Sequence, residues 1–90
     1  MTIVIEKFEA LPSGARVLEL SAESTTVSIY AGESFSSVCV KNAAHRAYRG
    51  AGRTYHGERR LERAAEDYKS EAVRSILRFA AEFLAPQQSN

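Results

Sequence analysis

The sequence is short of the residue types that carry covalent and metal chemistry. Among its 90 residues there is one cysteine, Cys39, no tryptophan, and two histidines, His45 and His56. A single cysteine cannot form an internal disulfide, and Cys39 has no partner at metal-ligand spacing, so we expect a half-buried strand thiol. The two histidines lie eleven positions apart, without cysteine or paired carboxylates at ligand spacing. We therefore expect no metal site.

Long apolar runs are also missing. No stretch approaches the roughly 20 residues that a membrane-spanning helix needs. The chain also meets the acidic Glu6 before the apolar core of a signal peptide could form. These absences predict a soluble, cytoplasmic protein with no membrane partner.

Motifs of catalysis and of cofactor binding are absent too. The serines form no nucleophile elbow or triad order, and no GxxxxGK[ST] phosphate loop occurs. The stretch from Gly50 to Gly52 lacks the third glycine and the preceding strand of a dinucleotide-binding fingerprint. We expect a protein that is not an enzyme, with no catalytic residues and no cofactor.

The size of the chain limits it to one small core. Ninety residues with 44% hydrophobic content suit a single domain over residues 1–85, followed by a polar tail over residues 86–90. Pairing between subunits would bury further apolar surface. Phe35, Phe79, Phe83 and Leu84 exceed what one sheet face readily covers, so we expect a homo-oligomer.

The first forty residues have the pattern of β-strands. Runs rich in Val, Ile, Thr, Tyr and Phe occupy residues 2–8, 16–21, 25–31 and 35–40, and turn-forming residues separate them. Val27 and Ile29 alternate with polar neighbours, as a half-buried strand requires. Short connections favour antiparallel pairing, so the sequence predicts a four-stranded antiparallel meander.

Residues 58–85 instead show a helical period. Apolar residues recur there at spacings of three and four, namely at Leu61, Ala65, Tyr68, Ala72, Ile76, Phe79 or Ala80, and Phe83. Ser70 is a suitable N-cap, which leaves either one bent helix or two helices broken near Ser70. We expect this segment to cover one face of the sheet, which makes the fold α+β. Residues 42–50 could add one or two helical turns. Residues 51–57 are expected to form an ordered loop, in which residues 53–55 could be extended.

Positive charge is concentrated in the middle of the chain. The net charge is −3 over residues 1–40, +5 over residues 41–63 and −1 over residues 64–90. The basic segment also contains glycines and tyrosines. Arginine binds phosphate bidentately, glycine lets a ligand approach the backbone, and an aromatic ring can stack on a base. The predicted binding residues are Arg46, Tyr48, Arg49, Arg53, Tyr55 and Arg59.

Three classes of partner remain open for this segment. Concentrated arginine and glycine favour a compact nucleotide-like small molecule, bound without catalysis. A nucleic acid is the second class, although the total charge of +1 argues against a non-specific binder. A host protein is the third. The alternative without any function is that the arginines are solvated or paired with carboxylates, while Tyr48 and Tyr55 cover the core edge.

The middle segment also carries a resemblance. The sequence VKNAAHRAYRGAGRTY over residues 40–55, with YKSEAV over residues 68–73, resembles small uncharacterised proteins encoded by bacteriophages. The resemblance implies a counter-defence accessory, a class that sequesters a nucleotide messenger or blocks a host protein. It assigns no functional residue.

Overall fold

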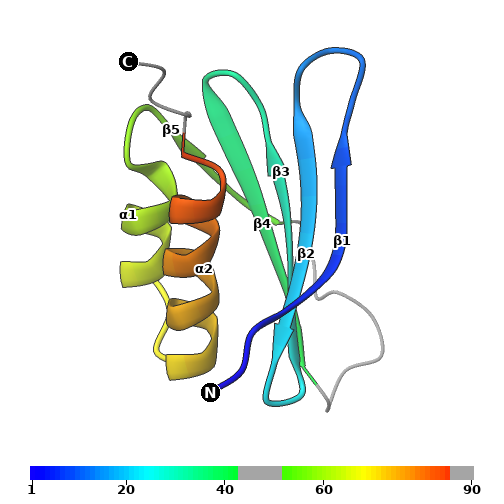
Figure 1. The fold of residues 1–90 in the computed structure, drawn as a ribbon. Helices are drawn as coiled ribbons and strands as arrows, with labels where there is room; N and C mark the ends of the chain where they lie inside the picture. Colours follow the sequence, from blue (N-terminus) through cyan, green and yellow to red (C-terminus); the bar gives the residue numbers. More distant parts are fainter. Residues whose placement is uncertain (43–51, 86–90) are drawn as a thin grey trace.

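The chain forms a five-stranded antiparallel sheet followed by two helices (Figure 1). The computed structural model describes residues 1–42 and 52–85. The strands follow one another in the sheet in chain order, and each pairs antiparallel with the next. The elements are β1 (Val4–Ala10), β2 (Arg16–Ala22), β3 (Thr25–Ala31), β4 (Phe35–Asn42), β5 (Arg53–His56), α1 (Arg60–Glu66) and α2 (Glu71–Phe83).

The antiparallel meander is confirmed, but the predicted number of four strands is wrong. A fifth strand, β5, pairs with β4. It is only four residues long and stands between Gly52 and Gly57, and glycine-rich flanks are typical of a loop. β4 ends at Asn42 and β5 begins at Arg53, so the two strands are too far apart in the sequence for a short turn to indicate that they pair. The predicted helical turns lie outside the described residues except for Asn42, which ends β4.

Gly52 allows β5 to approach β4 closely. A Cβ atom at this position would lie 2.5 Å from the Cys39 Sγ atom and 2.8 Å from the Val38 carbonyl oxygen. The second distance is to backbone, which cannot swing aside as a side chain can. Only glycine therefore fits here without displacing one strand from the other.

The helical segment divides at the residue that the sequence indicated. Ser70 is the N-cap of α2, and its hydroxyl oxygen accepts a hydrogen bond from the Val73 N–H at 3.3 Å. Of the two open alternatives, two separate helices are therefore confirmed. Both lie on the same face of the sheet (Figure 1), as the sequence predicted.

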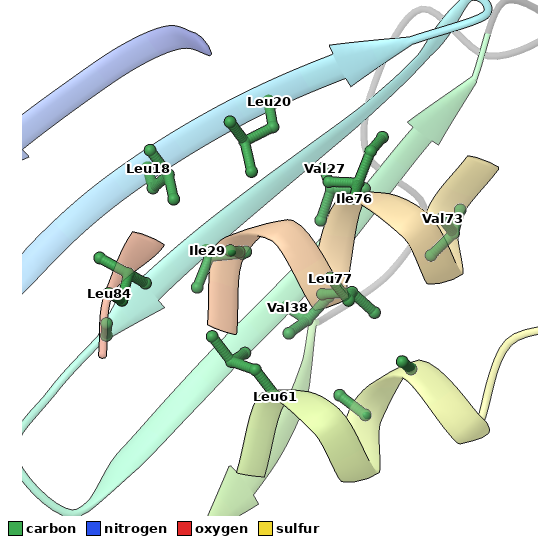
Figure 2. Packing of buried hydrophobic residues seen from close by; sticks show 14 of the residues in the cluster. Leu18, Leu20, Val27, Ile29, Val38, Leu61, Val73, Ile76, Leu77 and Leu84 are labelled. Carbon is green, nitrogen blue, oxygen red and sulfur yellow. The ribbon is translucent and has the colours of Figure 1, made fainter. Parts of the chain in front are cut away.

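The core lies between this sheet face and the helices (Figure 2). Leu18, Leu20 and Ile29 contribute from the strands, and Ile76 and Leu77 from α2, all with no exposed area. Phe83, which the helical period places on the core-facing side, is 40% exposed in the single chain, whereas Leu84 is 6% exposed. The break before Ser70 restarts the helix and shifts its buried stripe. That stripe consists of Val73, Ile76, Leu77 and Ala80.

Candidate functional site

The six predicted binding residues do not form one group in the structure. Arg46, Tyr48 and Arg49 lie outside the described residues. Arg53 and Tyr55 lie together on β5, whereas Arg59 lies beyond that strand, directly before α1. The described part of the predicted site therefore divides into two places with different surroundings.

Arg53 and Tyr55 face the helices. Arg53 is paired with Val38, which is buried, and paired residues of antiparallel strands share a face. The Arg53 guanidinium carbon lies 5.2 Å from the centroid of the Tyr68 ring. The Tyr55 hydroxyl donates a hydrogen bond to the Asp67 carboxylate at 2.9 Å. These contacts connect β5 to the end of α1. Arg53 and Tyr55, which the sequence predicted to bind a ligand, therefore contact residues of the chain itself.

The Tyr55 contact predicts a loss of stability at high pH. Burial, followed by the hydrogen bond to Asp67, raises the pKa of Tyr55 to about 12 from its usual 10.0. Between these two values the unfolded chain releases the phenol proton while the folded protein retains it, so the free energy of unfolding falls as pH rises.

Tyr55→Phe tests this prediction by urea unfolding at a series of pH values. The variant lacks the hydrogen bond, so we expect it to be less stable than the wild type at pH 9. The difference should shrink as pH rises from 10 to 12. Tyr30→Phe, which removes a hydroxyl from the opposite sheet face, is the control. A difference that stays constant with pH would contradict the assignment to Tyr55.

An open cavity of about 880 Å³ lies at one end of the sheet. The β1–β2 and β3–β4 connections, the start of α1 and the end of α2 meet there, at the top of Figure 1. Three arginines and three glutamates line it, together with two aromatic rings. These residues are Arg16, Tyr30, Glu33, Phe35, Glu58, Arg59, Arg60 and Glu62.

Arg60 is held in the cavity wall by three neutral acceptors. Its Nε donates to the Ser36 hydroxyl at 2.8 Å, Nη1 donates to the Gly57 carbonyl at 2.9 Å, and Nη2 donates to the Gly32 carbonyl at 2.6 Å. Ser36 is only 1% exposed. Among residues 1–42 and 52–85, no carboxylate oxygen lies within 4.0 Å of this guanidinium. The bonds orient Arg60 without neutralising its charge.

Arg16 has a similar environment. Its side chain is half-buried, and Nη2 donates to the Leu84 carbonyl at 3.0 Å. This guanidinium also has no carboxylate oxygen within 4.0 Å in the part of the chain that the structure describes. Each guanidinium carries five N–H donors, so Arg16 and Arg60 both keep donors beyond the bonds they make. A half-buried charge that lacks a counter-ion costs free energy, and an anion in the cavity would reduce that cost.

Arg59 also lines the cavity, but its side chain is more exposed than those of Arg16 and Arg60. Its backbone is left-handed, with φ 57° and ψ 27°, and its side chain is 79% exposed. Its Nε lies 3.9 Å from a Glu62 carboxylate oxygen, a distance at which an exposed ion pair contributes little. Arg59 can therefore turn towards a ligand at small cost.

Two aromatic rings form another part of the wall. Tyr30 and Phe35 are stacked, with ring centroids 5.7 Å apart and ring planes 27° from parallel. Tyr30 is 37% exposed, and Phe35 is half-buried. The Phe35 ring also lies 6.2 Å from the His56 ring. A flat ligand ring can stack at this surface.

Sequence reasoning missed most of this cavity. Arg16, Tyr30 and Phe35 belong to the acidic strand region, so they lie outside the basic segment from which the binding residues were predicted. Arg60 belongs to the basic segment but was not among the six predicted residues. One signal was present: Ser36 is a polar residue at a core-facing strand position, and such a group needs a hydrogen-bond partner.

Comparison with known proteins does not assign a function to the cavity. No family model matches the sequence, and neither does any curated protein or solved structure. Within residues 1–42 and 52–85, no three His, Cys, Asp or Glu residues are grouped so as to hold a metal ion. The helices of the same residues are too short or too polar to span a bilayer.

Proposed function

We propose that the protein binds a phosphate-bearing small molecule of nucleotide type in this cavity, without catalysis. The observation that supports the proposal is the pair of half-buried arginines, Arg16 and Arg60, whose hydrogen-bond partners among residues 1–42 and 52–85 are all neutral carbonyl or hydroxyl oxygens. A phosphate group supplies both the counter-charge and the acceptor oxygens that these guanidinium groups lack. Charge-assisted hydrogen bonds of this kind are the stronger ones in proteins.

The rest of the cavity suits the other parts of a nucleotide. The stacked Tyr30 and Phe35 rings offer a surface for a base, and Arg59 can reach a second phosphate. Glu33 and Glu58 offer acceptors for sugar hydroxyls or base amino groups.

The same charges favour a small molecule over a nucleic acid. Three glutamates stand beside three arginines around the cavity, so a long polyanion would meet repulsion as well as attraction. With the resemblance to bacteriophage proteins, the role we propose is sequestration of a nucleotide. Nucleic-acid binding and inhibition of a host protein are the outcomes that a negative test would favour.

Isothermal titration calorimetry with inorganic phosphate, mononucleotides and cyclic nucleotides tests the proposal. We expect at least one of these nucleotides to bind, and Arg16→Ala to weaken its affinity by about 10- to 150-fold, since a lost charge-assisted hydrogen bond costs roughly 1.5–3 kcal/mol. Arg78→Ala, on an exposed part of α2 outside this cavity, is the matched control and should change nothing.

A further variant separates the cavity from the site predicted on β5. Arg53→Ala should leave the affinity unchanged if the cavity holds the ligand. If Arg53→Ala weakens the affinity for the nucleotide and Arg16→Ala does not, the ligand binds at the predicted basic segment and not in the cavity. Binding of an oligonucleotide with a steep salt dependence, and of no nucleotide, would instead support the nucleic-acid alternative.

A further inference from the structure

In the part of the chain that the structure describes, β1 is an edge strand of the sheet and no further strand covers its outer side. All seven residues from Val4 to Ala10 are exposed, and within residues 1–42 and 52–85 only β2 pairs with β1 (Figure 1). The outer side of β1 thus presents backbone N–H and C=O groups that another strand can bind.

The same strand carries apolar side chains on its core-facing side. Ile5 and Phe8 are paired with Leu20 and Leu18, which are fully buried, so both point to the face that the helices cover. Ile5 is nevertheless 41% exposed and Phe8 is 47% exposed, so the helices cover these residues only in part.

Phe8 continues this surface onto α2. Its ring meets the Phe83 ring edge to face, with centroids 5.2 Å apart. Phe83 stacks in turn on Phe79 at 6.1 Å and is 40% exposed. Ile5, Phe8 and Phe83 form an apolar strip that leads from the core to the free edge, and we name it the β1 strip.

We propose that a second copy of this chain covers the β1 strip. In this dimer β1 pairs antiparallel with β1 of the second copy around a two-fold axis at Phe8, so that one continuous sheet crosses both copies. The two Phe8 rings then meet at the axis, with Phe83 of each copy beside them. The pairing gives hydrogen-bond partners to the backbone groups on the outer side of β1, and it also buries the exposed apolar side chains of the β1 strip.

The charges of β1 select this register. An axis at Phe8 places Lys7 of each copy opposite Glu9 of the other, so two attractive pairs form. Shifting the axis to Lys7 or to Glu9 places two like charges opposite each other, which is destabilising. An axis at any one residue of β1 keeps the helices of both copies on the same side, since side chains alternate along a strand, and these three axes are the ones centred on the charged, regular part of β1.

The irregular part of β1 lies outside the region this pairing needs. The register with β2 shifts between Ile5 and Lys7, and then runs regularly from Lys7 to Ala10. A bulge and a lysine on an edge usually hinder pairing with another strand. Here the bulge leaves the second half of β1 regular, and the lysine meets a carboxylate in one register. Within one chain Lys7 and Glu9 are 3.9 Å apart and more than half exposed, so both are free to change partner.

Charge exchange tests the dimer by sedimentation velocity over a range of protein concentrations. We expect the wild type to reach twice the chain mass of 9.9 kDa. Lys7→Glu and Glu9→Lys should each weaken dimerisation by about tenfold, because each creates two repulsive pairs. The double variant should recover the wild-type affinity. Lys69→Glu, an exposed charge reversal outside the β1 strip, should leave the affinity unchanged.

Cross-linking tests the register itself. In a Cys39→Ser background, Phe8→Cys should form a disulfide-linked dimer on oxidation, whereas Ala10→Cys should not, because only residue 8 lies on the axis. A wild type that stays at one chain mass at every concentration would overturn the proposal. So would a double charge variant that fails to recover, or a dimer that links through Ala10→Cys and not through Phe8→Cys.

Discussion

Arg60→Ala is expected to lower the free energy of unfolding by about 3 kcal/mol or more. The substitution removes the donor of three hydrogen bonds and leaves the nearly buried Ser36 hydroxyl and two carbonyl oxygens, those of Gly32 and Gly57, without this partner. In a domain of this size such a loss lowers the melting temperature by more than about 10 °C. Chemical denaturation followed by circular dichroism measures the change.

The neighbouring arginine provides the control. Arg59→Ala removes the same charge from the same wall, but the Arg59 side chain is 79% exposed and, within residues 1–42 and 52–85, makes only the long ion pair to Glu62. We expect this substitution to change the free energy of unfolding by about 0.5 kcal/mol or less. Arg60→Lys should recover only part of the stability, because an ammonium group cannot reproduce the planar fork. Equal effects of Arg59→Ala and Arg60→Ala would show that Arg60 does not organise the cavity.

Leu77→Ala is expected to destabilise the protein by about 2–5 kcal/mol. Leu77 has no exposed area and packs in the core between α2 and the strands (Figure 2), so truncation leaves a cavity. Thermal unfolding at low protein concentration, where the proposed dimer is dissociated, measures this loss.

Phe83→Ala is the matched comparison for Leu77→Ala. It removes a larger side chain, but that side chain is 40% exposed, and its ring contacts are with Phe8 and Phe79. We expect a smaller loss of stability than for Leu77→Ala. The opposite order would mean that the helical stripe predicted from the sequence, with Phe83 in the core, describes the packing better.

Local sequence patterns were sufficient to predict much of the fold. The alternation of Val27 and Ile29 with polar neighbours reports a strand with one buried face, and the confirmed meander follows from short turns between such strands. Ser70 marked the start of α2, because an N-cap acts through its own hydrogen bond to a residue three positions later. These features depend on neighbours in the chain.

The candidate site depended on distant residues and was predicted poorly. Arg59 was among the predicted residues and lines the cavity, but Arg16 stands more than forty positions before it in the sequence. Nothing near Arg16 in the sequence shows that its guanidinium meets the carbonyl of Leu84, 68 positions away. Tyr55 and Arg53 were chosen as ligand contacts, and the structure gives both of them partners within the chain at Asp67 and Tyr68.

By itself the sequence determined that antiparallel strands precede a helical segment, that Ser70 marks the place of any break in that segment, and that the positive charge gathers between the two halves. Only the tertiary structure decided that β5 joins the sheet, that Leu84 and not Phe83 is buried, and that Arg16 and Arg60 share one cavity. The physical reason is the range of the interactions. Alternation, helical period and capping act over a few residues, whereas strand pairing, helix packing and the meeting of charged groups depend on how the whole chain closes.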